Sequence, residues 1–384
     1  MKRLVLLGMA AWAGVLPSQF ELRVRPFVQI VGDNQMGVSW LVTSNAFGHV
    51  NWKQQGDTWT EAYYAVDGLR EANTPIQRAL LSGYDPTLPL DFQVTSSELR
   101  AFRLYRAPEY GNSVTFQSPT VRALMTAEGE TSFAVFTDTH SHTNCYPSLL
   151  PKLGEGLRFI VLAGDNLDDA QTEQKAVDGL FAPMAWLTEQ GLACLFLRGN
   201  HETRGAFARN LKNYLVLSDN TYYGAMTLGP LRLIWLDCGE DKVDGHAEYN
   251  GLNDFAPYMK RQLEWLTREV QSEPFTRATW RIVIVHIPPE WRAGREWEGT
   301  WRMNAEFAPV LNQARVTAMI GGHTHKPALL TPSEREGYGF KGPVFIGGAW
   351  PAEKQVITRV DVLKDHLKIT MINADGSTFA EKTW

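Results

Sequence analysis

Five of the nine histidines in this 384-residue chain lie in short polar clusters that also contain aspartate and asparagine. The clusters are Asp-x-His at 138–140, Gly-Asp-Asn at 164–166, Gly-Asn-His-Glu at 199–202, a single histidine at 286 and His-x-His at 323–325. Each follows an apolar run typical of a buried β-strand, at 133–136, 159–162, 192–197, 282–285 and 316–320. Loops past the carboxyl ends of such strands meet at one edge of an α/β sheet, so we expect these side chains to form one site.

Taken singly, these residues indicate little. An aspartate after a strand usually caps a turn or a helix, and His286, before Ile287-Pro288, has the setting of a core histidine. The repetition at the ends of successive strands is harder to explain by chance. Imidazole, carboxylate and amide groups together are ligands for borderline and hard cations, so the set predicts a metal centre.

In this order the clusters resemble those of the calcineurin-like metallophosphoesterases. The resemblance implies two divalent or trivalent metal ions, with Fe, Mn or Zn expected. It assigns Asp138, His140 and His325 to one ion and Asn200, His286 and His323 to the other. It also implies two catalytic residues, Asp165 as the bridge between the ions and His201 as the general acid.

Chemistry favours the same mixture of residues. Two metal ions activate a water to hydroxide and offset the phosphoryl charge during in-line attack. His201 would protonate the departing alkoxide, with Glu202 or Asp237 as candidates to orient it. The predicted function is hydrolysis of phosphomonoesters, and the alternative in the same class is phosphodiester hydrolysis. An inactive phosphatase-like binding or adhesion protein is the alternative of another class, and the intact ligand set argues against it.

A loop between the last two clusters is rich in aromatic and basic residues. Trp291, Arg292, Arg295 and Trp297 are candidate substrate-binding residues, because they could stack on and pair with an organic phosphate. The alternative is aromatic packing of a surface loop. The predicted partner is a small organic phosphate, and nothing in the sequence indicates an oligomeric state.

The chain divides into two patterns. Residues 19–120 read as strands (24–31, 36–42 and 101–105 among them) separated by turn signals, which predicts a fibronectin-like β-sandwich. Residues 121–384 alternate apolar strands with amphipathic stretches at 171–189 and 254–270 and end in a hairpin of 355–362 with 366–372. This pattern predicts an α/β domain, and the resemblance implies a four-layer α/β/β/α arrangement.

A β-sandwich before such a domain resembles the layout of purple acid phosphatases. Those enzymes carry a tyrosine ligand three residues after the second-cluster aspartate, where this chain has Asp168, and they lack a histidine ligand at the place of His140. The resemblance therefore implies a colourless site. We expect Asp168 and Asp169 to cap a helix beginning near Ala170.

Charge and composition exclude other classes. The net charge of −5 predicts no nucleic-acid binding, and three scattered cysteines form no disulfide framework. Lys2-Arg3 precede an apolar run at 4–16, which predicts a signal peptide at 1–18 and an exported, periplasmic or secreted protein. The alternative is a first strand or a buried helix in a cytoplasmic protein. No later run is long and apolar enough for a membrane span.

Overall fold

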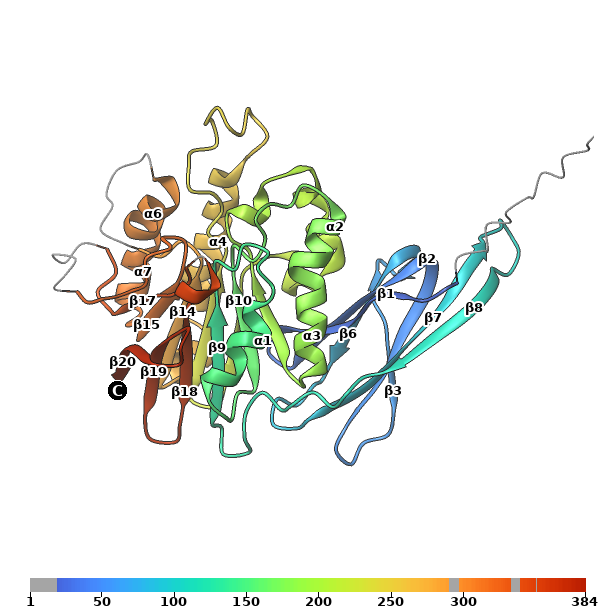
Figure 1. The fold of residues 1–384 in the computed structure, drawn as a ribbon, viewed down its shortest axis with the longest axis horizontal. Coiled ribbons are helices and arrows are strands. Elements are labelled where there is room, and N and C mark those ends of the chain that lie inside the picture. The colour runs from blue at the N-terminus through green and yellow to red at the C-terminus, as the bar shows by residue number, and fades with distance from the viewer. Residues whose placement is uncertain (1–18, 290–296, 333–338, 350) are drawn as a thin grey trace, which may run out of the picture.

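The computed structural model describes residues 19–289, 297–332, 339–349 and 351–384. Two large sheets face each other, and helices cover their outer faces (Figure 1). The predicted four-layer α/β/β/α arrangement of the catalytic half is confirmed.

The first sheet has a parallel centre and an antiparallel edge. The parallel strands are β9 (Thr131–Phe136), β10 (Phe159–Ala163) and β11 (Ala193–Leu197), and the edge strands are β18 (Val356–Val362), β19 (Leu367–Asn373) and β20 (Thr378–Thr383). The C-terminal hairpin predicted from the sequence is β18–β19, and β20 adds a strand that the prediction lacked.

The second sheet has the strand order β12-β13-β14-β15-β17-β16. Its strands are β12 (Gly224–Leu228), β13 (Leu231–Leu236), β14 (Trp280–Val285), β15 (Ala318–Gly321), β16 (Ala328–Leu330) and β17 (Val344–Ile346). The four from β13 to β17 in this order are parallel, and the outer strands β12 and β16 are antiparallel to their neighbours.

Alternate side chains of the central strands belong to different cores. In β9, Phe133 and Val135 pack between the two sheets, whereas Ala134 and Phe136 pack beneath the helices. A strand that is buried on both faces needs apolar residues at every position, which explains the unbroken apolar runs in the sequence.

Helices cover both outer faces. Those of the first half are α1 (Cys145–Leu149), α2 (Glu173–Ala176), a π-helical turn (Val177–Phe181) and α3 (Ala182–Glu189). Those of the second half are α4 (Phe255–Glu269), α5 (Glu273–Arg277), α6 (Glu298–Arg302), a π-helical turn (Met303–Phe307) and α7 (Ala308–Gln313). Short 3-10 helices are Leu150–Leu153, His201–Thr203, Ala206–Tyr214, Ser218–Asn220 and Ala352–Lys354. Both amphipathic stretches predicted from the sequence are helical.

The N-terminal region is rich in strands, as predicted, but most of these strands extend the catalytic sheet. Those in that sheet are β1 (Leu22–Gly32), β2 (Gln35–Gln54), β3 (Thr60–Ala62), β6 (Ala72–Ser82), β7 (Leu90–Ala101) and β8 (Glu109–Gln117). The other two, β4 (Ala65–Val66) and β5 (Leu69–Arg70), pair with each other in a separate two-stranded sheet. Strand β1 pairs in parallel with β11 at Gln29 and Cys194, so ten strands from β20 to β8 run in one continuous order, with β3 and β6 beside β2. Trp40 and Phe92 share a core with Phe133 of the catalytic half.

Hydrogen bonds and packing thus cross the boundary expected at residue 120, and the fibronectin-like sandwich of residues 19–120 stays a prediction. An alternating pattern predicts a strand but does not name the strand beside it. The strand expected at 101–105 is also absent: β7 ends at Ala101, and Leu104 and Tyr105 in the following loop are 80% and 96% exposed.

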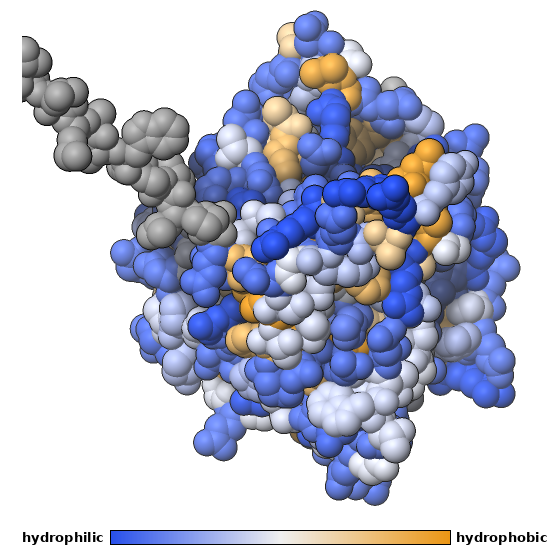
Figure 2. Space-filling view, turned by 90° about the vertical axis from the view of Figure 1, so that its right-hand side faces the viewer, coloured by the Kyte–Doolittle hydropathy of each residue, from blue (hydrophilic) through white to orange (hydrophobic). Residues whose placement is uncertain are grey.

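Strands β7 and β8 form a long arm that extends from the body (Figure 1). The molecule seen from that side is mostly hydrophilic, with apolar residues scattered among polar ones (Figure 2). Among the described residues no helix has the length and apolar character needed to cross a membrane.

Candidate dinuclear metal centre

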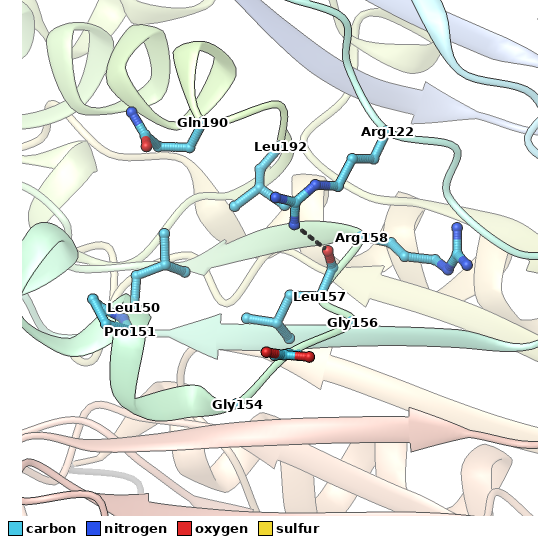
Figure 3. A pocket seen from close by; sticks show the side chains of 10 residues that line it. Arg122, Leu150, Pro151, Gly154, Gly156, Leu157, Arg158, Gln190 and Leu192 are labelled. Carbon is cyan, nitrogen blue, oxygen red and sulfur yellow. Dashed lines mark hydrogen bonds between the residues drawn. The ribbon is translucent and has the colours of Figure 1, made fainter.

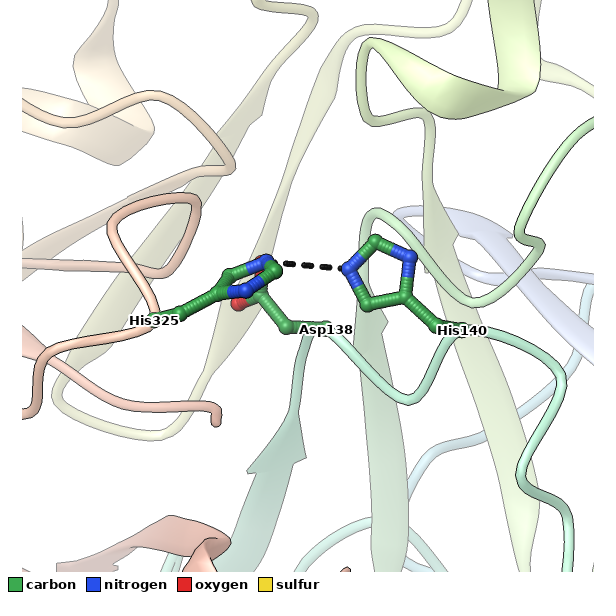
Figure 4. Close-up of side chains that lie close together, drawn as sticks. All are labelled: Asp138, His140 and His325. Carbon is green, nitrogen blue, oxygen red and sulfur yellow. Dashed lines mark hydrogen bonds and ion pairs between the residues drawn. The ribbon is translucent and has the colours of Figure 1, made fainter. Parts of the chain in front are cut away.

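The loops after β9, β10, β11, β14 and β15 bring their polar side chains together at one edge of the molecule. Asp138, His140 and His325 form one group, in which the candidate ligand atoms lie within 4.8 Å of one another. His140 and His325 face each other from different loops beside Asp138, with their Nε2 atoms 3.0 Å apart (Figure 4).

A second group lies against the first. Asp165, His286 and His323 have ligand atoms within 4.8 Å of one another, and His323 Nδ1 lies 3.1 Å from Asn200 Oδ1. His286 Nε2 is 3.0 Å from Asp165 Oδ2 and 4.0 Å from Asp138 Oδ1, so the two groups adjoin. All seven candidate ligands therefore share one site, and their division between two ions stays a prediction.

The side chain of His286 tests whether these residues fit a metal. Its Nδ1 lies 3.0 Å from the carbonyl oxygen of Ala163, which fixes a proton on Nδ1, so that the neutral ring has its lone pair on Nε2. Nε2 is fully buried and, among the described residues, has no partner at hydrogen-bonding angles although Asp165 Oδ2 is 3.0 Å away. The two atoms are therefore close enough to bind one cation, and the buried Nε2 is without a well-aligned partner otherwise in the part of the chain that the structure describes.

The backbone at the site is unusual. Five of the seven candidate ligands adopt a left-handed conformation, with φ values of 54° at Asp138, 42° at His140, 50° at Asp165, 69° at His323 and 54° at His325. A non-glycine residue in this region costs about 1–2 kcal/mol. Strain of this kind gathers at functional sites, where the surrounding fold holds side chains in place.

Charge interactions within the site are strong. Burial opposes ionisation of Asp165, but His286 and His201 outweigh it and hold the pKa of Asp165 well below its usual range. Burial by itself lowers the pKa of His286, yet Asp165 and Asp138 raise that pKa to about 9. Burial and the neighbouring His286 lower the pKa of His323 to about 4.

His201 stands beside the two groups. Its Nδ1 donates to the carbonyl oxygen of Asp168 at 2.6 Å, and its Nε2 lies 3.8 Å from Asp165 Oδ2. The backbone of Asp168 thus orients the ring, in place of the two acidic side chains proposed from the sequence. Asp237 forms an ion pair with Arg198 at 2.5 Å, and the Glu202 carboxylate accepts hydrogen bonds from backbone N–H groups.

Glu202 is fully buried and holds two site loops together. Its carboxylate accepts backbone N–H groups from Asp165 (2.9 Å), Asn166 (2.7 Å), Leu167 (3.0 Å) and Gly199 (2.7 Å). Burial raises the pKa of Glu202, while the donors from Leu167 and Gly199 favour the carboxylate. In the sequence this glutamate simply follows His201. Its role depends on contacts with residues 165–167, which only the folded structure brings near it.

Two glycines leave room for the side chain of the candidate ligand Asp138. A Cβ at Gly322 or at Gly348 would collide with the carboxylate of Asp138. Gly348 has a φ of 74° and belongs to none of the predicted clusters, so no sequence signal pointed to it.

Asp168 does not cap a helix. Helix α2 begins at Glu173, and the side chain of Thr172 caps it by accepting from the Lys175 backbone at 3.2 Å. Asp168 is 70% exposed, and its carboxylate lies 3.7 Å from His140 Nδ1. The capping prediction was wrong because the loop after β10 stays irregular for longer than its sequence suggests.

The candidate substrate-binding residues are only partly covered. Trp291, Arg292 and Arg295 lie outside the described residues. Trp297 directly precedes α6 and is 39% exposed. Its role stays a prediction.

A cavity of about 510 Å³ lies away from the metal centre, lined in part by Arg122, Leu157, Arg158, Gln190 and Leu192 (Figure 3). Arg122 donates to the carbonyl oxygen of Leu157 at 2.8 Å there. Leu157 and Arg158 precede β10 and Leu192 precedes β11, so this cavity lies at the amino ends of those parallel strands. The candidate ligands lie at the carboxyl ends.

Comparison with known proteins agrees with this geometry. The family Calcineurin-like phosphoesterase matches residues 131–327, more than half of the chain, and the chain belongs to this family. A search of curated proteins found no match. The family and the clustered ligands make the protein a phosphoric ester hydrolase with a dinuclear metal site.

Solved structures are similar to this chain at low sequence identity, and the first of the three described here shares its fold. A purple acid phosphatase from yellow lupin (Lupinus luteus) seeds is 12% identical, with 93% of this chain and 73% of that chain covered and a TM-score of 0.61. A predicted phosphoesterase from Streptococcus pneumoniae is 11% identical (66% and 97% covered, TM-score 0.29). A putative 5'-nucleotidase from Staphylococcus aureus, solved with alpha-ketoglutarate, is 14% identical (66% and 54% covered, TM-score 0.38).

Proposed function

We propose that this protein is a metal-dependent phosphatase that hydrolyses phosphomonoesters, with His201 as the general acid. The observation that carries the proposal is the position of His201 Nε2, 3.8 Å from Asp165 Oδ2 at the centre of the seven candidate ligands. An acid at this place can reach the oxygen of a leaving group whose phosphate is bound at the same centre.

Asp138, His140 and His325 would hold one ion, Asn200, His286 and His323 the other, and Asp165 would serve both. A mixture of imidazole and carboxylate ligands suits Fe, Mn or Zn. When bound, such a pair supplies Lewis acidity and an activated water at neutral pH.

The chain's own residues position the proton transfer. The hydrogen bond from Nδ1 to the Asp168 carbonyl fixes the ring of His201 with Nε2 toward the centre, so the protonated ring donates from Nε2. Glu202 keeps the loops that carry Asp165 and His201 in register. A positioned acid of this kind contributes about 10²–10⁴-fold to the rate.

One experiment tests the proposal directly. Purified protein is analysed for bound metals and assayed with several divalent ions on phosphomonoesters, phosphodiesters and pyrophosphates. We expect two transition metals per chain and the highest kcat/KM on monoesters. A higher kcat/KM on diesters would mean that the protein is a phosphodiesterase instead. A protein with neither bound metal nor activity would favour the inactive binding protein.

We also propose that the protein is exported, on the basis of Lys2-Arg3 and the apolar run at 4–16. N-terminal sequencing of the protein recovered outside the cytoplasm is expected to begin near residue 19. A protein that keeps Met1 and stays in the cytoplasm would contradict export.

A further inference from the structure

Arg204 lies beside the proposed general acid. Its Nη1 is 3.3 Å from Nε2 of His201, the atom that faces the metal centre. The side chain is 29% exposed, so a ligand arriving from solvent can touch it. None of the sequence clusters includes this arginine.

The rest of the guanidinium is fixed by the segment that follows β13. Nε and Nη2 donate to the two carboxylate oxygens of Glu240 at 3.1 and 2.9 Å, and Nη2 also donates to Asp241 at 3.1 Å. Glu240 is 3% exposed and accepts further hydrogen bonds from Thr203 (2.7 Å) and Tyr249 (2.8 Å). This bidentate pair holds the planar group in one orientation.

That anchoring leaves one nitrogen directed at the site. Within the described part of the chain, Nη1 has His201 as its hydrogen-bond partner. The neutral ring of His201 accepts one of the two N–H groups of Nη1 and the protonated ring accepts neither, so at least one donor is left for a ligand. Because Glu240 already restricts the side chain, little rotamer entropy is lost when Nη1 binds an anion.

We propose that Arg204 is a specificity-determining residue that donates from Nη1 to a non-bridging phosphate oxygen and thereby favours monoesters. A monoester has three non-bridging oxygens and two negative charges near neutral pH, whereas a diester has two such oxygens and one charge. The guanidinium of Arg204, a fixed cationic donor beside the proposed acid His201, therefore interacts more strongly with a monoester, which has the additional oxygen and charge. This inference rests on the proposed phosphatase function and names the group that sets its substrate class.

The test compares two substrates with the same leaving group, 4-nitrophenyl phosphate and bis(4-nitrophenyl) phosphate. Arg204→Lys keeps a charge for Glu240 but loses the planar fork, and Arg204→Gln removes the charge. The control is Arg209→Gln, because Arg209 donates to the carbonyl oxygen of Leu252 instead. Metal content and the binding of inorganic phosphate to the metal-loaded proteins are measured by elemental analysis and calorimetry.

We expect both Arg204 variants to keep two metals, to bind phosphate about 10-fold more weakly, and to lose about 10-fold or more in kcat/KM on the monoester, the scale of one charge-assisted hydrogen bond. The loss on the diester is expected to stay within about 3-fold on the same scale, and Arg209→Gln is expected to match the wild type. Equal losses on the two esters, or unchanged phosphate binding, would overturn the role of Arg204. A wild-type protein inactive on both esters would instead overturn the proposed function.

Discussion

Each of two site histidines uses its nitrogens for separate tasks. His286 and His201 both donate from Nδ1 to a backbone carbonyl, at Ala163 and Asp168, and both direct Nε2 into the centre. The backbone bond keeps a proton on Nδ1 of both rings, so Nε2 offers a lone pair to a metal when the ring is neutral and a proton to a leaving group when the ring is protonated. The two rings differ in burial: His286 is fully buried, and His201 is partly exposed.

His201→Ala separates catalysis from metal binding. We expect this variant to keep both metals and to lose about 10²-fold or more on an alkyl phosphate, whose leaving group needs the proton. Loss on a nitrophenyl ester is expected to be much smaller, because that leaving group departs as a stable anion. The measurement is kcat on both esters together with metal content. Equal losses accompanied by metal depletion would mean that His201 supports the ligands and is not the acid.

Metal affinity is expected to rise with pH. Asp165 and Asp138 raise the pKa of His286 to about 9 in the metal-free protein, so this histidine is protonated at pH 7 and must lose its proton to bind a metal. The raised pKa means that proton competition is strong below pH 9 and fades above it. We expect the affinity to rise by up to about 10-fold per pH unit between pH 7 and 9 and then to level off.

Titration of the metal-free protein with Zn²⁺ or Mn²⁺ at several pH values, by calorimetry in buffers of different ionisation enthalpy, measures both the affinity and the protons released. His286→Gln is the matched variant, with weaker binding and a shallower pH slope expected. An affinity that stays constant from pH 7 to 9 would contradict a protonated His286.

At the scale of elements, the site depends on how two loops are tied together. The loop after β10 and the turn after β11 contribute Asp165 and His201, and the Glu202 carboxylate accepts four N–H groups from them. The strands set the position of each loop, and this buried carboxylate sets the spacing between the loops. Its effect is therefore on geometry and stability rather than on the reaction itself.

Glu202→Gln tests that function. The amide keeps one acceptor oxygen and turns an NH₂ group toward backbone donors, so two buried N–H groups lose their acceptor. We expect the free energy of unfolding to fall by about 2–6 kcal/mol, on the basis of 1–3 kcal/mol for each of the two unsatisfied groups, together with lower metal occupancy. Urea unfolding measures the first effect. Glu155→Gln on the exposed surface is the control, and a Glu202→Gln protein as stable as that control would refute the role of Glu202.

The whole molecule is built around a sheet that joins the N-terminal strands to the catalytic half. The pairing of β1 with β11 and the core shared by Trp40, Phe92 and Phe133 cross the expected domain boundary. Arg232 of β13 adds a 2.7 Å ion pair to Asp33, in the turn after β1. The first hundred residues thus support the scaffold of the site although they contribute none of the candidate ligands.

Deletion of residues 1–120 is therefore expected to give an insoluble or unfolded protein, because it opens the edge of β11 and exposes part of the core between the sheets. A matched variant replaces only the exposed loop at 102–108 with a short turn, and it is expected to fold and to keep its metals. Soluble yield, circular dichroism and metal content are the measurements. A folded, metal-loaded fragment of residues 121–384 would show that the catalytic half is independent after all.

The sequence by itself determined the strands of the catalytic half and the set of candidate ligands. Strands buried on both faces need unbroken apolar runs, and polar residues that follow such runs stand out, as at Asp138 and His286. Patterns of this kind are local, so they can be recognised in the sequence without knowledge of the fold. The same reasoning found both long helical segments and the C-terminal hairpin.

Only the tertiary structure decided which strands and groups lie side by side. Four such contacts come from segments distant in sequence: the partner of β1, the carbonyl that orients His201, three of the four donors to Glu202 and the carboxylate that anchors Arg204. Such contacts depend on strand order and loop course, and a residue's own neighbours in the chain carry no signal for them. Alternation therefore showed that residues 24–31 form a strand, and the packing of the folded chain decided that this strand completes the catalytic sheet.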